Sequence, residues 1–122
     1  MEHIKEAKRY INNAKDILKE KAKKEDGFYS DAKYVKMAGH TAYSGVLVAL
    51  DGVYGTKAKG RKDVDWYKQN IAKNYKKLLP LFLAIYDTLH LSLGYDGNPD
   101  AKVAQSGLIN AEKLMGAFTS KN

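Results

Sequence analysis

Apolar residues recur at alternating three- and four-residue spacings along most of the chain, which is the pattern of helices with one buried face. The first stripe predicts a helix over residues 2–24, with lysines on its opposite side. The glycine of "KEDGF" then breaks the pattern. A second helix is expected to begin after Ser30, which is a suitable N-cap, and to end near Tyr54.

The second half of the chain predicts two further helical regions. Apolar positions from Trp66 to Leu93 keep the helical spacing for nearly thirty residues, with Pro80 inside the stretch. Because proline removes a backbone donor and crowds the preceding turn, we expect a kink or break just before Leu79. The last helix is predicted over residues 99–118, with Asn98 as its N-cap.

The absence of strand-like alternation sets the fold class. No run alternates between apolar and polar residues over the length of a strand. We therefore predict an all-α protein, an antiparallel up-and-down bundle of four to five helices. The length of 122 residues suffices for one core, so residues 1–122 are expected to form a single helical-bundle domain.

Composition narrows the function classes. The chain has no cysteine, which excludes disulfide and thiolate chemistry. The amino-terminal stretch is charged throughout and no long uninterrupted apolar run is present, so a cytoplasmic protein without a membrane partner is expected. The net charge of +7 favours acidic partners. A lysine-rich solvated surface is the simpler explanation, since arginine, the better reader of phosphates and bases, occurs only at Arg9 and Arg61.

Nucleic acid is the acidic partner with the most specific candidates. The basic segment 55–63 contains almost no apolar residue and is expected to be an exposed loop. Aromatic residues that follow it are available for base stacking. The candidate residues for RNA or DNA are Lys57, Lys59, Arg61, Lys62, Trp66 and Tyr67.

The most apolar helix carries several polar candidates. His40, Tyr43 and Ser44 fall on adjacent turns of one side of it. We predict that they are mainly interior hydrogen-bonding groups beside a close helix contact, since glycines in the same helix need such compensation. Asp51 lies near the helix C-terminus, where the dipole is unfavourable, and is expected to pair with a lysine from residues 57–62.

A second pair of candidates lies in "DTLH". Asp87 and His90 are three residues apart, which on an α-helix gives half of a carboxylate-histidine metal site. The matching half is missing, so no metal or other cofactor is predicted, and no catalytic residue is assigned. A ligand or enzyme site formed by His40, Tyr43, Asp87 and His90 remains the alternative, if these side chains converge on one cavity.

The stretch "YVKMAGHTAYSGVLVALDGVYG" resembles the second helix of a HEPN domain. That family has an alanine, an aromatic and a small residue followed by an alanine-rich aliphatic tail. The matching residues here are Ala42, Tyr43, Gly45, Ala49 and Leu50. The late segment "LHLSLGYDG", followed by "SGLINAEKLMGAF", also resembles the end of HEPN-type modules. An uncharacterised family of bacterial helical bundles is the alternative.

The HEPN ribonuclease motif is missing. It consists of an arginine followed after four to six residues by a histidine, and neither Arg9 nor Arg61 has a histidine at that distance. The resemblance therefore implies a non-catalytic relative that pairs with itself, with a nucleotidyltransferase or with nucleic acid. We predict a non-enzymatic binding or partner module that forms a homodimer, with nucleic-acid binding through the lysine-rich surface as the alternative.

Overall fold

Helices make up nearly all of the protein. The computed structural model describes residues 2–54 and 62–119. Its helical elements are α1 (Glu2–Glu20), α2 (Ala32–Tyr54), α3 (Val64–Asn74), the 3-10 turn η1 (Lys76–Leu78), α4 (Leu79–Ile85), the π-helix η2 (Tyr86–Tyr95) and α5 (Ala101–Thr119). The predicted all-α fold class is confirmed.

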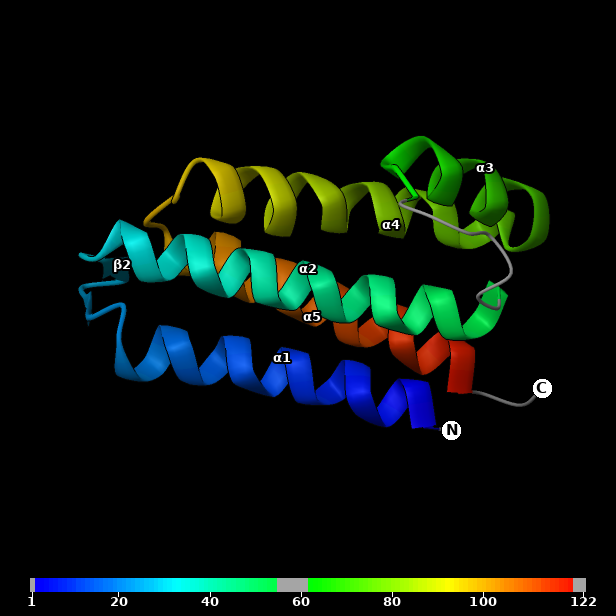
Figure 1. Cartoon of the computed structure of the whole chain (residues 1–122). Helices are drawn as coiled ribbons and strands as arrows, with labels where there is room; N and C mark the ends of the chain where they lie inside the picture. Colours follow the sequence, from blue (N-terminus) through cyan, green and yellow to red (C-terminus); the bar gives the residue numbers. More distant parts are fainter. Residues whose placement is uncertain (1, 55–61, 120–122) are drawn as a thin grey trace.

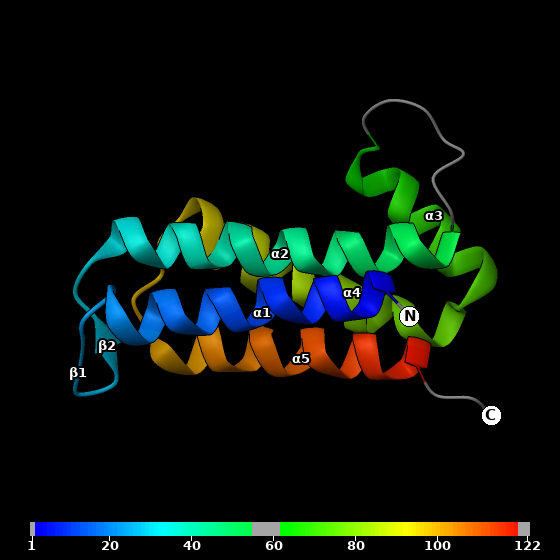
Figure 2. The same cartoon turned by 60° about the horizontal axis from the view of Figure 1, so that its bottom comes forward.

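The long helices form an up-and-down bundle (Figure 1). Helices α1 and α2 run antiparallel, α4 and η2 form one rod that returns along α2, and α5 runs back beside them. Figure 2 shows α1 between α2 and α5, with the rod of α4 and η2 on the far side. Short helix α3 packs at the end of the bundle where α4 begins.

The core lies between these helices and follows the stripes predicted from the sequence. Helix α1 contributes Ile4, Ala7, Ile11, Ala14 and Leu18, all of which are buried. The largest side chain fully inside the core is Phe82 of α4. Every residue in the buried part of the described chain is apolar or aromatic, so burial of apolar surface is the main force that holds the helices together.

A small hairpin corrects the prediction for the first helix. Helix α1 ends at Glu20 instead of near residue 24, and strands β1 (Lys24–Glu25) and β2 (Phe28–Tyr29) pair antiparallel before α2. Gly27 has a φ of 83°, and the turn depends on this left-handed conformation. Strands of two residues are too short to show alternation, so no pattern in the sequence predicted them.

Two predicted N-caps are displaced by one or two residues. The Asp31 carboxylate accepts from the Lys33 amide, whereas the Ser30 hydroxyl donates to the carbonyl of Lys23. At α5 the Asp100 carboxylate caps the helix by accepting from Lys102. The Asn98 side chain accepts from the Asp100 amide two residues further along the chain. In both places an aspartate one or two residues after the predicted cap takes the role, because aspartate caps a helix as well as serine or asparagine does.

The predicted interruption at Pro80 is confirmed. Helix α3 ends at Asn74, the 3-10 turn Lys76–Leu78 follows, and α4 begins at Leu79 with Pro80 in its first turn. Proline is well placed there, because the first amides of a helix have no partner in the helix. The stretch from residue 66 to 93 is thus divided among four helical elements: α3, η1, α4 and η2.

The last piece, η2, is wound as a π-helix over ten residues. The hydrogen bond at its carboxyl end joins residues five apart, as in a π-helix: the Asp96 amide donates to the Leu91 carbonyl at 2.9 Å. By length and composition alone, the span Lys76–Tyr95 would also suit a membrane crossing, with a mean hydropathy of 1.3. It is the one such span in the described ranges, and a single span of this kind is weak evidence for a membrane crossing.

Glycines bring α2 into close contact with its neighbours. A Cβ atom on Gly39 would lie 2.6 Å from both the Gly94 amide nitrogen and the Leu93 Cβ of η2. A Cβ on Gly45 would lie 2.6 Å from the Cβ of Tyr10 in α1. These approaches confirm the prediction that helix contact compensates for the glycines of this helix.

Replacing Gly39 with alanine should therefore strain the contact between α2 and η2. We expect Gly39→Ala to lower the free energy of unfolding by about 1–3 kcal/mol, the usual cost of overpacking. The matched control is Gly116→Ala in α5, where an added Cβ meets nothing within 4 Å. That variant should be neutral or more stable by up to about 1 kcal/mol. Urea unfolding of both measures the difference, and equal effects would contradict the close contact.

Candidate functional site

The winding of η2 places three ring side chains in a row. Tyr86, His90 and Tyr95 are four and five residues apart, spacings that match the wider turn of a π-helix. The ring centroids of Tyr86 and His90 are 5.0 Å apart, and those of His90 and Tyr95 are 5.1 Å apart. An α-helix advances 100° per residue, so it would place Tyr86 and Tyr95 on opposite sides.

Helix α2 completes this cluster with His40 and Tyr43. The Tyr43 ring lies 4.7 Å from the His90 ring and 5.8 Å from the Tyr86 ring. The His40 ring lies 6.1 Å from the rings of both His90 and Tyr95. We refer to His40, Tyr43, Tyr86, His90 and Tyr95 as the aromatic cluster. Three of the predicted candidates, His40, Tyr43 and His90, therefore do converge.

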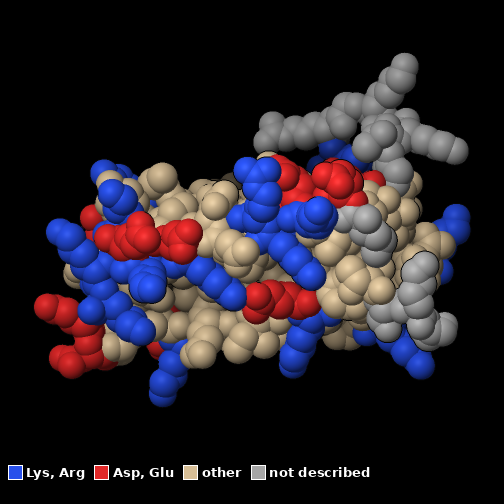
Figure 3. All heavy atoms as spheres, turned by 90° about the horizontal axis from the view of Figure 1, so that it is seen from below, with Lys and Arg blue, Asp and Glu red and all other residues tan. Residues whose placement is uncertain are grey.

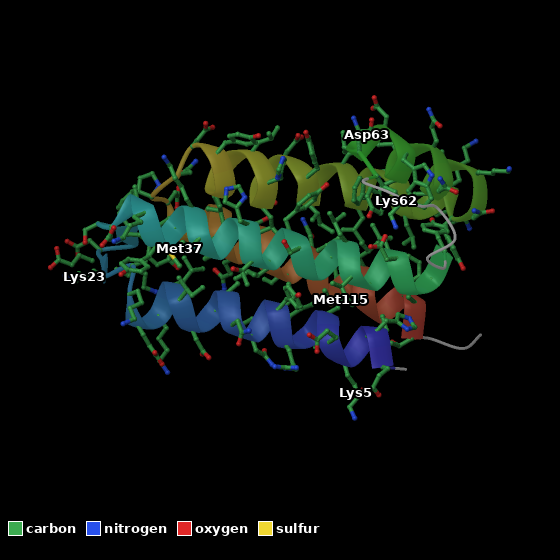
Figure 4. All side chains as sticks on the ribbon, in the orientation of Figure 1. Lys5, Lys23, Met37, Lys62, Asp63 and Met115 are labelled. Atoms are coloured by element: carbon green, nitrogen blue, oxygen red, sulfur yellow. The ribbon has the colours of Figure 1, made fainter. Side chains whose placement is uncertain are left out.

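A groove of about 330 Å³ runs beside the aromatic cluster, between α2, η2 and the start of α3. Ser44 and Leu47 contribute to its wall from α2. Figure 4 shows Lys62 and Asp63, which line its far end, above the C-terminal half of α2. Asp87 is exposed and is not among the lining residues, so the alternative of a site formed by all four residues loses its carboxylate.

The winding of η2 explains why Asp87 does not lie beside His90. Residues three apart share a side of an α-helix, but a π-helix has more residues per turn and separates them. The pair Asp87 and His90 therefore does not form half of a metal site. Among residues 2–54 and 62–119, no three histidine, aspartate or glutamate side chains are close enough to hold a metal ion together.

Burial determines the protonation of the cluster. Desolvation lowers the pKa of His90, and the nearby His40 lowers it further. The Nδ1 atom of His90 is buried and has no hydrogen-bond partner in the described part of the chain. Burial also raises the pKa of Tyr43, with Tyr86 adding to the effect. At neutral pH His90 and Tyr43 are thus uncharged, which suits contact with another uncharged surface.

Of the three α2 residues predicted to be interior hydrogen-bonding groups, His40, Tyr43 and Ser44, only one is buried. Tyr43 is buried, but His40 and Ser44 are exposed on the outer side of α2. This corrects the prediction that all three are interior hydrogen-bonding groups. Neighbouring helices cover α2 on the side of Gly39 and Gly45 and leave its outer side open.

Asp51 has the lysine partner that its position requires. The Lys62 Nζ atom lies 2.9 Å from the Asp51 carboxylate, and this confirms the predicted pairing with a lysine of residues 57–62. The Tyr67 hydroxyl donates to the same oxygen at 2.7 Å. Burial raises the pKa of Tyr67, followed by the effect of this hydrogen bond, so the hydroxyl stays protonated. The three residues fasten the start of α3 to the end of α2.

The two aromatic nucleic-acid candidates differ in how accessible they are for stacking. Tyr67 is buried, with 3% of its surface exposed. The Lys62 Nζ atom lies 5.2 Å above the Trp66 ring, and Tyr54 and Tyr67 meet that ring edge-on. The prediction that Tyr67 is free to stack on bases is therefore wrong, whereas stacking on the half-buried Trp66 stays a prediction.

The remaining basic candidates are Lys57, Lys59 and Arg61, which lie outside the described residues. Lys62 is described, and its side chain is 12% exposed because it is paired with Asp51. Binding of nucleic acid through the segment 55–63 stays a prediction.

Sequence reasoning missed three residues of this region: Leu47, Tyr86 and Tyr95. Tyr86 was counted only within a long apolar stretch, and Tyr95 lies just beyond its predicted end. The one available signal was their spacing from His90, four residues before and five after. That spacing is meaningful only when the helix is known to be wound as a π-helix, a form often found at functional sites.

Two comparisons relate the chain to known proteins. The model of the family described as "Domain of unknown function (DUF5618)" matches residues 2–120. The chain belongs to this family. A solved structure of a protein of unknown function from Dyadobacter fermentans is similar to this DUF5618 chain, with 60% sequence identity and a TM-score of 0.90. The match covers 95% of this chain and 93% of that one. No curated protein matches the sequence.

The family assignment fits the second option raised by the sequence, an uncharacterised family of helical bundles. The similarity to the Dyadobacter protein extends over nearly the full length of both chains. The function of the DUF5618 chain therefore has to be argued from its own surfaces.

The protonation of His90 is directly testable. We expect its imidazole to titrate below 6.5 in a histidine NMR titration, because burial disfavours the charged ring. The stability that a neutral His90 contributes is present above the unfolded value near 6.5 and is lost as the pH falls through the folded value. In His40→Gln the titration midpoint should rise toward 6.5. A midpoint of 6.5 or above in the wild type would contradict the packing of the cluster.

The link between α2 and α3 gives a second test. Tyr67→Phe removes the hydroxyl that donates to Asp51 and should lower the free energy of unfolding by about 1–2 kcal/mol. Tyr34→Phe is the control, since the Tyr34 ring is half-buried and contacts the exposed Lys33. It should change stability by less than about 0.5 kcal/mol. Similar losses in both variants, measured by urea unfolding, would show that the hydroxyl of Tyr67 is unimportant.

Proposed function

We propose that this DUF5618 protein is a non-enzymatic binding module that forms a homodimer through the outer side of α2 and the adjoining aromatic cluster. The observation that supports this proposal most strongly is the uncharged outer side of α2. No residue from 37 to 50 is an aspartate, glutamate, lysine or arginine, although the outer side of this stretch faces solvent. Exposed positions of a bundle helix are usually charged or polar, so this side is suited to a partner.

The exposed residues of this surface have the character of a protein interface. Met37, His40 and Ser44 are exposed and follow one another at helical spacing. Met37 is 47% exposed and Tyr95, beside His40, is 63% exposed. Methionine and tyrosine are enriched in protein interfaces, and tyrosine is frequent among residues that dominate binding energy. We call Met37, His40, Ser44 and the aromatic cluster the α2 surface.

Charge favours this surface for contact between two copies. The chain has a net charge of +7, so two copies repel one another in most orientations. The α2 surface has no lysine among its residues and its one perturbed histidine is held neutral. A two-fold dimer formed there keeps most lysines far from the interface and in water.

Non-enzymatic function is proposed because the groove beside the cluster lacks a complete set of reacting groups. Ser44 and the two histidines line it, but a serine nucleophile needs a base oriented by a third group. The one carboxylate among the residues lining this groove is Asp63, and it caps α3 by accepting from the Trp66 amide.

The HEPN resemblance is part of the same proposal. The α2 residues that carry it, Ala42, Tyr43, Gly45, Ala49 and Leu50, are all buried, so they specify how α2 packs within its own chain. Non-catalytic members of the HEPN family pair with themselves or with a nucleotidyltransferase. Homodimerisation is the form of pairing that the α2 surface supports, and a nucleotidyltransferase remains a protein partner for the dimer in a cytoplasmic setting.

A charge placed on the α2 surface should separate the dimer. We expect Ser44→Glu to weaken self-association at least tenfold, because a carboxylate would be buried in the interface without a partner. The matched control is Ser106→Glu, an exposed serine of α5 outside the α2 surface, which alters the net charge equally. Light scattering coupled to size-exclusion chromatography measures the mass of each variant over a range of concentrations.

The result expected for the wild type and Ser106→Glu is the mass of two chains, and for Ser44→Glu that of one. A wild type that stays monomeric at high micromolar concentration would overturn the proposed homodimer. If Ser44→Glu dimerises as well as the wild type, the interface lies outside the α2 surface. Mixing with short single-stranded RNA tests the alternative, since a salt-sensitive increase in mass would favour nucleic-acid binding over self-association.

A further inference from the structure

A second surface lies on the other side of the bundle, between α1 and α5. Helix α1 packs mainly on α2 and touches α5 along only part of its length. Two hollows of about 600 Å³ and about 390 Å³ follow the line between α1 and α5. Figure 3 views this side of the molecule, where lysine and arginine side chains extend along the face with acidic side chains between them.

The two hollows are parts of one groove. Glu112 of α5 lines both, and its carboxylate accepts from the Lys15 Nζ atom of α1 at 2.8 Å. This ion pair crosses the groove between the hollows. Both side chains of the pair are nearly half exposed, so opening it costs little. We call this continuous hollow the α1–α5 groove.

The α1–α5 groove has an apolar floor. Ile11 and Leu18 of α1 and Leu108 and Met115 of α5 line it with the outer edges of core side chains. Ile109 stands at its edge with 43% of its surface exposed. Apolar side chains of a partner would be removed from water on such a floor.

The rim of the groove is basic. Lys8, Lys15 and Lys19 follow one side of α1 at spacings of seven and four residues, and Lys24 of the hairpin extends the row. Glu112 is the one acidic residue among those lining the groove. From Lys8 to Lys19 the row covers about 17 Å of helix, which is three turns.

We infer that the α1–α5 groove docks an acidic amphipathic helix of a partner protein. A helix of three to four turns matches the length of the lysine row, and glutamates at three- and four-residue spacing would face those lysines. Leucines on the intervening side would rest on the apolar floor. This docking is independent of the α2 surface, so a dimer would present two such grooves.

A labelled model peptide tests the docking. The probe is a fluorescein-labelled helical peptide of about 18 residues, with leucines at three- and four-residue spacing flanked by glutamates. The comparison peptide has lysines in place of the glutamates. Fluorescence anisotropy with the full chain should show binding of the acidic peptide in the micromolar range and at least tenfold weaker binding of the basic one.

Variants assign the binding to the groove. Lys8→Glu combined with Lys19→Glu should weaken binding at least tenfold, whereas Lys73→Glu combined with Lys77→Glu, with the same charge change away from the groove, should alter it less than twofold. Ile109→Ser should weaken binding severalfold through loss of apolar contact. Glu112→Gln should strengthen it, since the competing carboxylate is removed.

Three results would overturn the inference. The first is no binding of the acidic peptide at high micromolar protein. The second is an equal loss in the two double variants, which would indicate attraction to the net charge alone. The third is unchanged binding in Ile109→Ser together with tighter binding of single-stranded RNA, which would make the lysine row a site for phosphates.

Discussion

The contact between Gly39 of α2 and Gly94 of η2 is the constraint on which the other features of the site depend. A Cβ on Gly39 would lie 2.6 Å from the Gly94 amide nitrogen and 2.7 Å from the Leu89 carbonyl oxygen, so α2 rests almost directly on the backbone of η2. Such an approach brings the His40 and Tyr43 rings against the rings of η2. A larger residue at position 39 would separate the two helices and leave Tyr43 and His90 without their contacts.

The π-helical winding of η2 determines which of its side chains face α2. It aligns Tyr86, His90 and Tyr95 toward α2 and turns Asp87 into solvent. The result is an aromatic cluster without lysine, arginine, aspartate or glutamate, next to a helix side that also lacks them, on a protein of net charge +7. The opposite side of the bundle has a lysine row above an apolar floor. The two surfaces differ so clearly in charge that each suits a different kind of partner.

The sequence specified the helices well and the site only in part. Apolar stripes such as Ile4 to Leu18 located the buried sides, because the helical period requires one face to be apolar. The hairpin at Phe28 was too short to show a period. The meeting of His40 with His90 depends on how two helices rotate against each other, and the departure of Asp87 depends on the winding of η2. Neither property is recorded in the spacing of residues.

The most direct test of the proposed dimer uses the native methionines. Met37 lies on the α2 surface and is 47% exposed in the single chain, whereas Met115 of α5 is 1% exposed (Figure 4). Methyl NMR with a soluble paramagnetic agent reports how accessible each methyl group is to solvent. The account predicts that Met37 becomes as protected as Met115 as the protein concentration is raised. A Met37 methyl that stays fully accessible at every concentration would contradict it.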